Sequence, residues 1–213
     1  MELSLLIIFW YGILHAFGPD HLTAIADFSI GKNKRKTLMI TTLFAIGHGL
    51  SLFIFAKILQ HTDISEEILA YGDIISAAVI IGMGLYILFM VMGDRIQLHK
   101  HMHEGKEHIH IWFGRSHEHH DGIENSSSFS LGLLMGAGGV RGMLITLGVV
   151  QGGIVDFSMV TMFTLGVMLV FIAFGMLISY VNNNFLGNLT NVRRTFTTAG
   201  VISLLVGTNI LVG

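Results

Sequence analysis

Six long apolar runs dominate the hydropathy pattern of this chain, and polar stretches separate them. Each run holds about 20 residues or more, which is the length that an α-helix needs to cross a bilayer. We therefore expect an all-α, polytopic membrane protein with six transmembrane helices. The expected spans are roughly 3–30, 37–59, 68–93, 129–151, 157–181 and 196–213.

The first run is over-long for one straight span, and a polar heptapeptide interrupts it. This is His15-Ala16-Phe17-Gly18-Pro19-Asp20-His21, around the only proline of the chain. Proline donates no backbone hydrogen bond, and its ring clashes with the carbonyl group four residues earlier, here that of His15. We expect the helix to break at Gly18-Pro19 and the His15 carbonyl to be freed. Unwound backbone at membrane depth is tolerated where it lines a cavity.

Imidazole and carboxylate groups at membrane depth usually face a protein interior or a wet cavity. In a straight helix, Asp20 and His21 would point roughly 140° and 240° away from His15. The break can turn all three side chains toward one point. His48, in the middle of the second run, lies like His15 roughly 15–18 Å from the end of its span. Taken singly, each residue fits a kink or a helix–helix hydrogen bond; together they predict a metal site.

Three imidazoles and one carboxylate are ligands that suit Ni, Co, Cu and Zn, whereas Mg and Ca prefer oxygen. The chain has no cysteine, which excludes thiolate ligation and disulfides. Neutral imidazole is the form that binds metal, so protons compete with metal at such a site. Ser51, one turn beyond His48, is placed to orient its ring.

Two further ionisable residues are possible accessory groups. Asp27 lies two turns beyond Asp20, where it is either a cytoplasmic-side waypoint for the ion or a partner of Lys32 or Lys34. Arg141 lies near the middle of the fourth run and needs an anionic partner, for which Asp20 is the natural candidate. It either replaces the ion in the empty site or holds Asp20 as a structural pair. Asp73, Asp156 and Asn209, nearer the outer face, are expected to be caps or groups through which the ion enters.

Only 12% of the residues are charged, against about 25% in soluble domains. There is no basic patch with interleaved aromatic residues, so nucleic acid is not an expected partner. The basic residues instead cluster after the first, third and fifth runs, and the other two connections carry neither lysine nor arginine. The positive-inside rule then places both termini outside and these three connections in the cytoplasm. The basic residues concerned are Lys32, Lys34, Arg35, Lys36, Arg95, Lys100, Lys106, Arg115, Arg193 and Arg194.

The third connection, residues 94–128, is polar and rich in histidine. Irregular tracts of this kind bind transition metals weakly and need no packed core. We expect a solvated, disordered cytoplasmic loop that also captures metal. Its histidines are His99, His101, His103, His108, His110, His117, His119 and His120.

An internal repeat divides the chain around this loop. The segment Gly12–Gly18 matches Gly132–Gly138, 120 residues later, and Phe44–Leu50 matches Phe163–Leu169, 119 residues later. Three spans per repeat is an odd number, so the two halves must run in opposite directions, as in many secondary transporters. We expect inverted three-helix repeats at 1–93 and 129–213.

The pattern at His15, Asp20 and His21, with Gly47-His48 in the next helix, resembles the nickel/cobalt permease (NicO/NiCoT) family, in its six-helix form. A histidine-rich loop between two three-helix halves is also similar to members of that family. The resemblance implies transport of Ni²⁺ or Co²⁺ with His15, Asp20, His21 and His48 in the ion path. Gly138-Gly139-Val140-Arg141 departs from the acidic or proline-containing signatures of many relatives.

We therefore expect a secondary transporter of a divalent transition-metal cation in the cell membrane, with import and export both open. The ion is the substrate and no prosthetic group is expected; besides membrane lipid, a metallochaperone or a second copy of the chain are candidate partners. One alternative is an intramembrane metal-dependent enzyme in which the metal activates water. Another is a transporter of a different small solute, such as an amino acid whose carboxylate binds Arg141.

Overall fold

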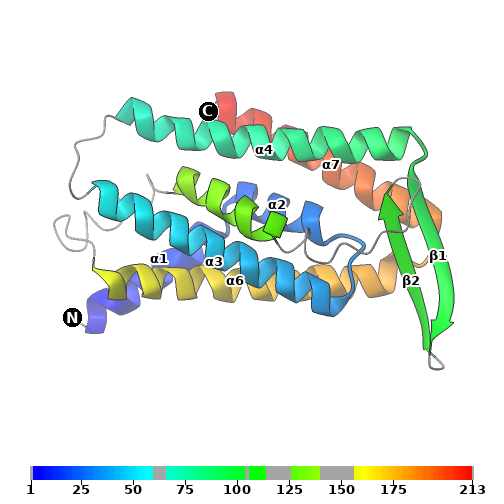
Figure 1. The fold of residues 1–213 in the computed structure, drawn as a ribbon, viewed down its shortest axis with the longest axis horizontal. Helices are drawn as coiled ribbons and strands as arrows, with labels where there is room; N and C mark the ends of the chain where they lie inside the picture. The colour runs from blue at the N-terminus through cyan, green and yellow to red at the C-terminus, as the bar shows by residue number, and fades with distance from the viewer. Residues whose placement is uncertain (1, 60–65, 104–105, 114–125, 140–155, 213) are drawn as a thin grey trace.

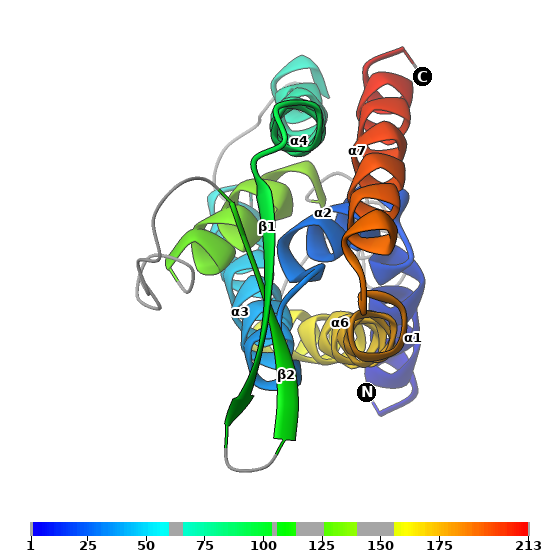
Figure 2. The same cartoon turned by 90° about the vertical axis from the view of Figure 1, so that its right-hand side faces the viewer.

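Long helices run side by side along one axis of the molecule, and a two-stranded sheet lies across one end of them (Figure 1). The structure is a computed structural model that describes residues 2–59, 66–103, 106–113, 126–139 and 156–212. Figure 2 looks onto the end that carries the sheet, which we call the hairpin end. The first and last described residues lie toward the opposite end (Figure 1).

The first apolar run is broken where the sequence predicts. Helix α1 (Glu2–Ala16) and helix α2 (Pro19–Ser29) meet at a bend of 61°. Pro19 is the first residue of α2, a position where a helix loses nothing by lacking an amide donor. The expectation of a free His15 carbonyl is wrong, because this carbonyl accepts a hydrogen bond from the Gly18 amide at 2.9 Å.

Four unbroken helices are long and apolar enough to cross a membrane: α3 (Lys34–Leu59), α4 (Glu66–Met92), α6 (Phe157–Phe185) and α7 (Leu189–Val212). The bent pair of α1 and α2 makes a fifth span if it is taken as one. The expected fourth span, 129–151, is helical over residues 126–139, and its remainder lies outside the described residues. Large apolar side chains such as Trp10, Phe89 and Leu205 are more than half exposed. Such a surface is costly in water and suits lipid.

The histidine-rich connection contains regular structure, so the prediction of a disordered loop is wrong for residues 96–103 and 106–113. Strands β1 (Ile96–His103) and β2 (Lys106–Phe113) form an antiparallel hairpin. The sequence alternates with a period of two, which suits a strand with two different faces. In this register Ile96 and Leu98 alternate along β1 with Gln97 and His99, and Ile109 and Ile111 alternate along β2 with His108 and His110. Ile96 is buried against apolar residues of α4 and α7, so the hairpin is anchored to the helices at its base.

Helices α1 and α6 cross at unusually close range through two glycines. A Cβ atom on Gly12 would collide with the carbonyl oxygen of Phe163. In the other direction, a Cβ atom on Gly166 would collide with the carbonyl oxygen of Phe9. Small residues allow backbones to approach in this way inside membranes. We call this contact the Gly12–Gly166 crossing.

Helix α3 and the helical residues 126–139 cross in the same manner. A Cβ atom on Gly47 would collide with the carbonyl oxygen of Phe129, and one on Gly132 with that of Phe44. We call this contact the Gly47–Gly132 crossing. It brings the backbone of residues 126–139 against the turn of α3 that carries His48.

Asn182 of α6 holds the turn between α2 and α3. Its amide nitrogen donates to the carbonyl groups of Ser29 and Lys32, at 2.8 and 2.9 Å. Its amide oxygen accepts from the Gly31 amide at 3.0 Å. One side chain therefore satisfies three backbone groups of a tight turn, which would otherwise be costly to bury.

Asp156 caps the start of α6, as one of its two expected roles. Its side chain accepts hydrogen bonds from the Phe157 amide at 2.6 Å and from the Ser158 hydroxyl at 2.7 Å. Both bonds favour the ionised carboxylate, with the Ser158 bond the larger effect, so they hold the pKa of Asp156 below its usual value.

The two crossings can be tested by adding one methyl group to each. Gly12→Ala and Gly132→Ala should each lower stability by about 1–3 kcal/mol, because the added carbon meets rigid backbone. Thermal unfolding of the purified protein in detergent measures this as a lower Tm. Gly82→Ala is the matched control, since nothing lies within 4 Å of the position of its Cβ atom. Equal melting temperatures for Gly12→Ala and Gly82→Ala would contradict the close packing.

Candidate metal centre

Three imidazole rings meet where α1, α2 and α3 come together. His15 lies in the last turn of α1, His21 lies in the first turn of α2, and His48 lies near the middle of α3. One ring nitrogen from each lies within 4.8 Å of the others. The ring centroids of His21 are 4.7 Å from those of His15 and 4.8 Å from those of His48. His21 and His48 are buried and His15 is half-buried.

The bend between α1 and α2 is what brings His15 and His21 together. Gly18 makes the tight approach possible, because a Cβ atom there would lie 3.0 Å from His21 Nδ1 and 3.2 Å from the His15 carbonyl oxygen. The α2 helix then leaves in a new direction with His21 on the side of α1 that faces α3. The predicted convergence of these side chains is confirmed for His15, His21 and His48.

Asp20 occupies a different position from the one expected of a ligand. Its Oδ1 lies 2.6 Å from His21 Nδ1, and Asp20 does not belong to the group of converging donor atoms. A carboxylate bonded to Nδ1 fixes the proton on that nitrogen and leaves Nε2 with a free lone pair. His21 Nε2 is buried and has no hydrogen-bond partner among the described residues. Asp20 therefore orients His21, in the manner of the carboxylate–histidine pairs behind many metal ligands.

One pair of donor atoms has the spacing of two ligands on a small transition-metal ion, and the third lies within 4.8 Å of both. His15 Nε2 and His48 Nε2 are 3.3 Å apart. A tetrahedral ion with metal–nitrogen bonds of about 2.0–2.1 Å separates its nitrogens by roughly 3.3 Å. Three neutral imidazoles without an oxygen donor favour Ni, Co, Cu or Zn over Mg or Ca.

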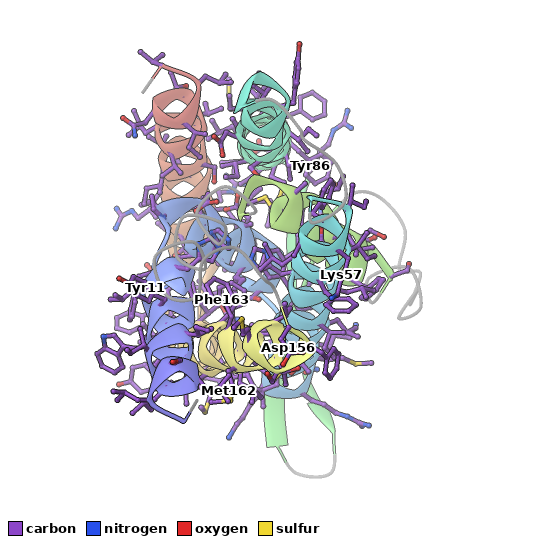
Figure 3. All side chains as sticks on the ribbon, turned by 90° about the vertical axis from the view of Figure 1, so that its left-hand side faces the viewer. Tyr11, Lys57, Tyr86, Asp156, Met162 and Phe163 are labelled. Atoms are coloured by element: carbon purple, nitrogen blue, oxygen red, sulfur yellow. The ribbon has the colours of Figure 1, made fainter. Side chains whose placement is uncertain are left out.

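Three phenylalanine rings pack against the imidazoles of the cluster. The Phe163 ring lies 5.3 Å from that of His15, and the Phe171 ring lies 5.8 Å from that of His21. Phe44 stacks on His48 at 6.2 Å, with 12° between the ring planes. Phe163 lies toward the middle of the bundle, whereas Tyr11 lies at its edge (Figure 3). Apolar rings next to the imidazoles lower the local dielectric constant, which strengthens electrostatic interactions there.

Gly139 packs directly against the rings of His15 and His48. A Cβ atom on Gly139 would lie 2.9 Å from His15 Nε2 and 3.3 Å from His48 Cε1. The backbone at Gly139 therefore lies close to the ring nitrogens of the cluster. Arg141, two residues further on, lies outside the described residues.

Two of the other expected roles change. Ser51 is buried against Gly136, and His48 Nδ1 has no hydrogen-bond partner among the described residues, so Ser51 does not orient the ring. Asp27 faces α7, where the Ser203 hydroxyl lies 2.6 Å from its Oδ2.

Four loop histidines occupy paired positions on the hairpin. His99 lies directly opposite His110, and His101 directly opposite His108. Directly opposite residues of an antiparallel pair have Cβ atoms about 4.5–5.5 Å apart, and alternate residues share a face. The four histidines therefore occupy two neighbouring pairs of alternate positions in the register. His103 lies opposite Lys106, whereas His117, His119 and His120 lie outside the described residues.

Sequence reasoning missed the aromatic shell, Gly139 and Ser203. Phe44 and Phe163 carried a signal, because they occupy matching positions of the internal repeat. Phe171 and Ser203 carried none, since an apolar run is full of phenylalanine and a serine in a helix is commonplace.

Comparisons with known proteins do not identify the chain: no family model matches it, and neither a curated protein nor a solved structure matches it significantly.

The orienting role of Asp20 predicts a graded loss of metal affinity. Asp20→Asn should weaken Ni²⁺ binding at the cluster by about 10–100-fold, which is typical for loss of a carboxylate behind a ligand. His21→Ala should weaken it further, because a donor atom is lost. Isothermal titration calorimetry measures both, with Asp156→Asn as the carboxylate control at the far end of the molecule. Equal losses for Asp20→Asn and His21→Ala would instead make Asp20 a direct ligand.

The hairpin register predicts a second, weaker class of metal site. Replacing His99, His101, His108 and His110 with alanine should reduce the number of Ni²⁺ ions bound per chain and leave the tight site intact. Lys100→Ala with Glu107→Ala changes the opposite face and should leave the number unchanged. Equilibrium dialysis with metal analysis gives both numbers; an undiminished number in the fourfold variant would rule out the hairpin site.

Proposed function

We propose that this protein is a secondary transporter that moves Ni²⁺ or Co²⁺ across the cytoplasmic membrane. The observation that carries the proposal is the meeting of His15, His21 and His48 at the break of an apolar helix. A break at the ion site gives the ligands two segments that can move relative to each other, as in transporters with discontinuous helices.

The ligand chemistry supports a borderline metal as the substrate. The donors are imidazoles, the surrounding rings offer no oxygen, and the nearest carboxylate is bonded to His21. A hydrated ion entering this site exchanges water for imidazole, which favours Ni²⁺ and Co²⁺ over Mg²⁺ and Ca²⁺. The resemblance to nickel/cobalt permeases, drawn from His15, Asp20, His21 and His48, points to the same ions.

The two glycine crossings support an inverted repeat of the two halves. Gly12 and Gly132 are 120 residues apart, as are their neighbours Phe9 and Phe129. Phe44 and Phe163 are 119 residues apart, as are Gly47 and Gly166. Exchanging the halves therefore converts one crossing into the other, carbonyl for carbonyl. Halves related in this way can exchange conformations around a central site, which gives alternating access.

The charge distribution supports the proposed orientation. The connections that carry Lys32 and Arg95, and the start of α7 that carries Arg193, lie at the hairpin end of the molecule, and both chain ends lie toward the other end. With the hairpin end in the cytoplasm, the termini are outside and the paired histidines lie where the ion is taken up or delivered. The sequence contains no phosphate-binding loop of the Walker type. An ion gradient, the membrane potential or a separate protein then supplies the energy.

Metal flux in proteoliposomes tests the proposal. Wild-type protein should carry Ni²⁺ and Co²⁺ into the vesicles, and His15→Ala or His48→Ala should reduce the initial rate at least tenfold, because a ligand is lost in each. His61→Ala, in the connection between α3 and α4, is the histidine control and should transport normally. Undiminished flux in the His48→Ala variant, or competition by amino acids in place of metals, would contradict the proposal.

A further inference from the structure

A cavity of about 450 Å³ lies between α2, α6 and α7, and none of its lining residues belongs to the three-histidine cluster. Asp27 of α2 contributes its carboxylate, and Arg194 of α7 its guanidinium. The rest of the lining is apolar apart from hydroxyl groups. Thr23, Thr195 and Thr198 supply these, and Phe174 is the residue from α6.

If Asp27 is ionised, the two short contacts of its partner Ser203 need two protons, and Ser203 has only one. The Ser203 hydroxyl oxygen lies 2.6 Å from Asp27 Oδ2 and 2.8 Å from the Ala199 carbonyl oxygen. A hydroxyl group has a single proton and can donate only one of these bonds. Both contacts are satisfied when Asp27 carries a proton, donates it to Ser203, and Ser203 donates to Ala199.

The other carboxylate oxygen points to the same state. Asp27 Oδ1 is buried and has no hydrogen-bond partner among the described residues. Leaving an ionised oxygen buried without a donor costs far more than leaving a neutral carbonyl oxygen there.

The charged groups around Asp27 favour a proton over a divalent cation as the species that its carboxyl group binds. Among the residues that the structure describes, Arg194 is the only other ionisable residue that lines the cavity; α6 contributes Phe174 to this lining and α4 contributes no described residue. Arg194 is nine residues before Ser203 on α7, about 13 Å along the helix, toward the hairpin end. On α2 itself, His21 precedes Asp27 by six residues and Lys32 follows the helix. A single carboxylate near an arginine offers a divalent cation too few ligands.

On the basis of the proposed transport function, we propose that Asp27 is the proton-binding site of the transporter and that loading the histidine cluster with metal releases this proton. His21 and Asp27 lie on the same short helix, about 9 Å apart along its axis. A divalent charge at that distance in a medium of low dielectric favours the ionised carboxylate. One metal ion in then means one proton out to water through the cavity, which is metal–proton exchange.

Release of the proton also changes how α2 is held. The carboxyl group of Asp27 bonds α2 to α7 through Ser203 while it is protonated. After deprotonation, Ser203 has one proton for two acceptors, so donating it to the Asp27 carboxylate breaks its bond to the Ala199 carbonyl group. The hydrogen bonds between α2 and α7 therefore differ between the metal-free and the metal-loaded protein.

Infrared difference spectra of the purified full chain test this directly. Adding Ni²⁺ at a pH at which the metal-free protein shows the C=O stretching band of a protonated carboxyl group should remove that band and release about one proton per ion. Asp27→Asn has the shape of the protonated side chain, so it should fold, bind Ni²⁺ and show neither signal. Asp156→Asn is the matched control and should show both. A band and a proton that persist in Asp27→Asn would overturn the assignment.

Flux separates this inference from the proposed function. In proteoliposomes, Asp27→Asn should still carry Ni²⁺ down the Ni²⁺ gradient. The increase in flux caused by a pH gradient should be at least tenfold smaller in Asp27→Asn than in the wild type. Wild-type vesicles that carry no metal would refute the transport function itself. Wild-type flux with unchanged pH stimulation in Asp27→Asn would refute only the role of Asp27, and loss of all flux would make Asp27 part of the ion path instead.

Ser203 provides an independent variant with an expected direction. Ser203→Ala removes the group that accepts the proton of Asp27, so the neutral carboxyl group loses a partner and the proton should be released at lower pH. A shift of release to higher pH would mean that Ser203 donates to an ionised carboxylate, and would contradict the proton count above.

Discussion

The bend between α1 and α2 is the constraint on which the rest of the site depends. Pro19 cannot continue the helix that ends at Ala16, and Gly18 leaves room for the His21 ring against the preceding turn. The 61° change of direction places two imidazoles from one apolar run within 4.8 Å of a third from α3. A straight helix would place His15 and His21 on different sides and expose at least one of them to lipid.

Packing around the bend supplies the second feature of the site, which is a close, apolar surrounding for the three imidazoles. The Gly12–Gly166 crossing holds α1 against α6, and the Gly47–Gly132 crossing holds α3 against the helical residues 126–139. These contacts bring the Phe163 and Phe44 rings over the imidazoles from both halves of the chain. The lower local dielectric constant strengthens ligand–metal attraction and makes unpaired nitrogens costly, so the site favours an ion that satisfies them.

The sequence was sufficient for those features that follow from single residues or simple periods. One proline and its polar neighbours predicted the break, run length predicted the helices, and the depth of His15 and His48 predicted their meeting. The role of Asp20 was not predictable, because spacing alone does not distinguish a carboxylate that binds metal from one that bonds the next histidine. The hairpin was not predicted, because a polar, histidine-rich composition is typical of an irregular loop. The signal for strands was the alternation of Ile96, Leu98, Ile109 and Ile111 with polar residues. The Asp27–Ser203 contact joins residues 176 positions apart, and no local pattern reports it.

The first coordination shell of an added metal ion is the most direct test of the three-histidine centre. X-ray absorption at the nickel edge, on Ni²⁺-loaded protein whose four paired hairpin histidines are alanine, reports that shell without the weaker sites. We expect one tightly held ion per chain with the multiple-scattering signature of three imidazoles, falling to two in His48→Ala. A shell made only of oxygen, or no retained ion, would contradict the three-histidine centre.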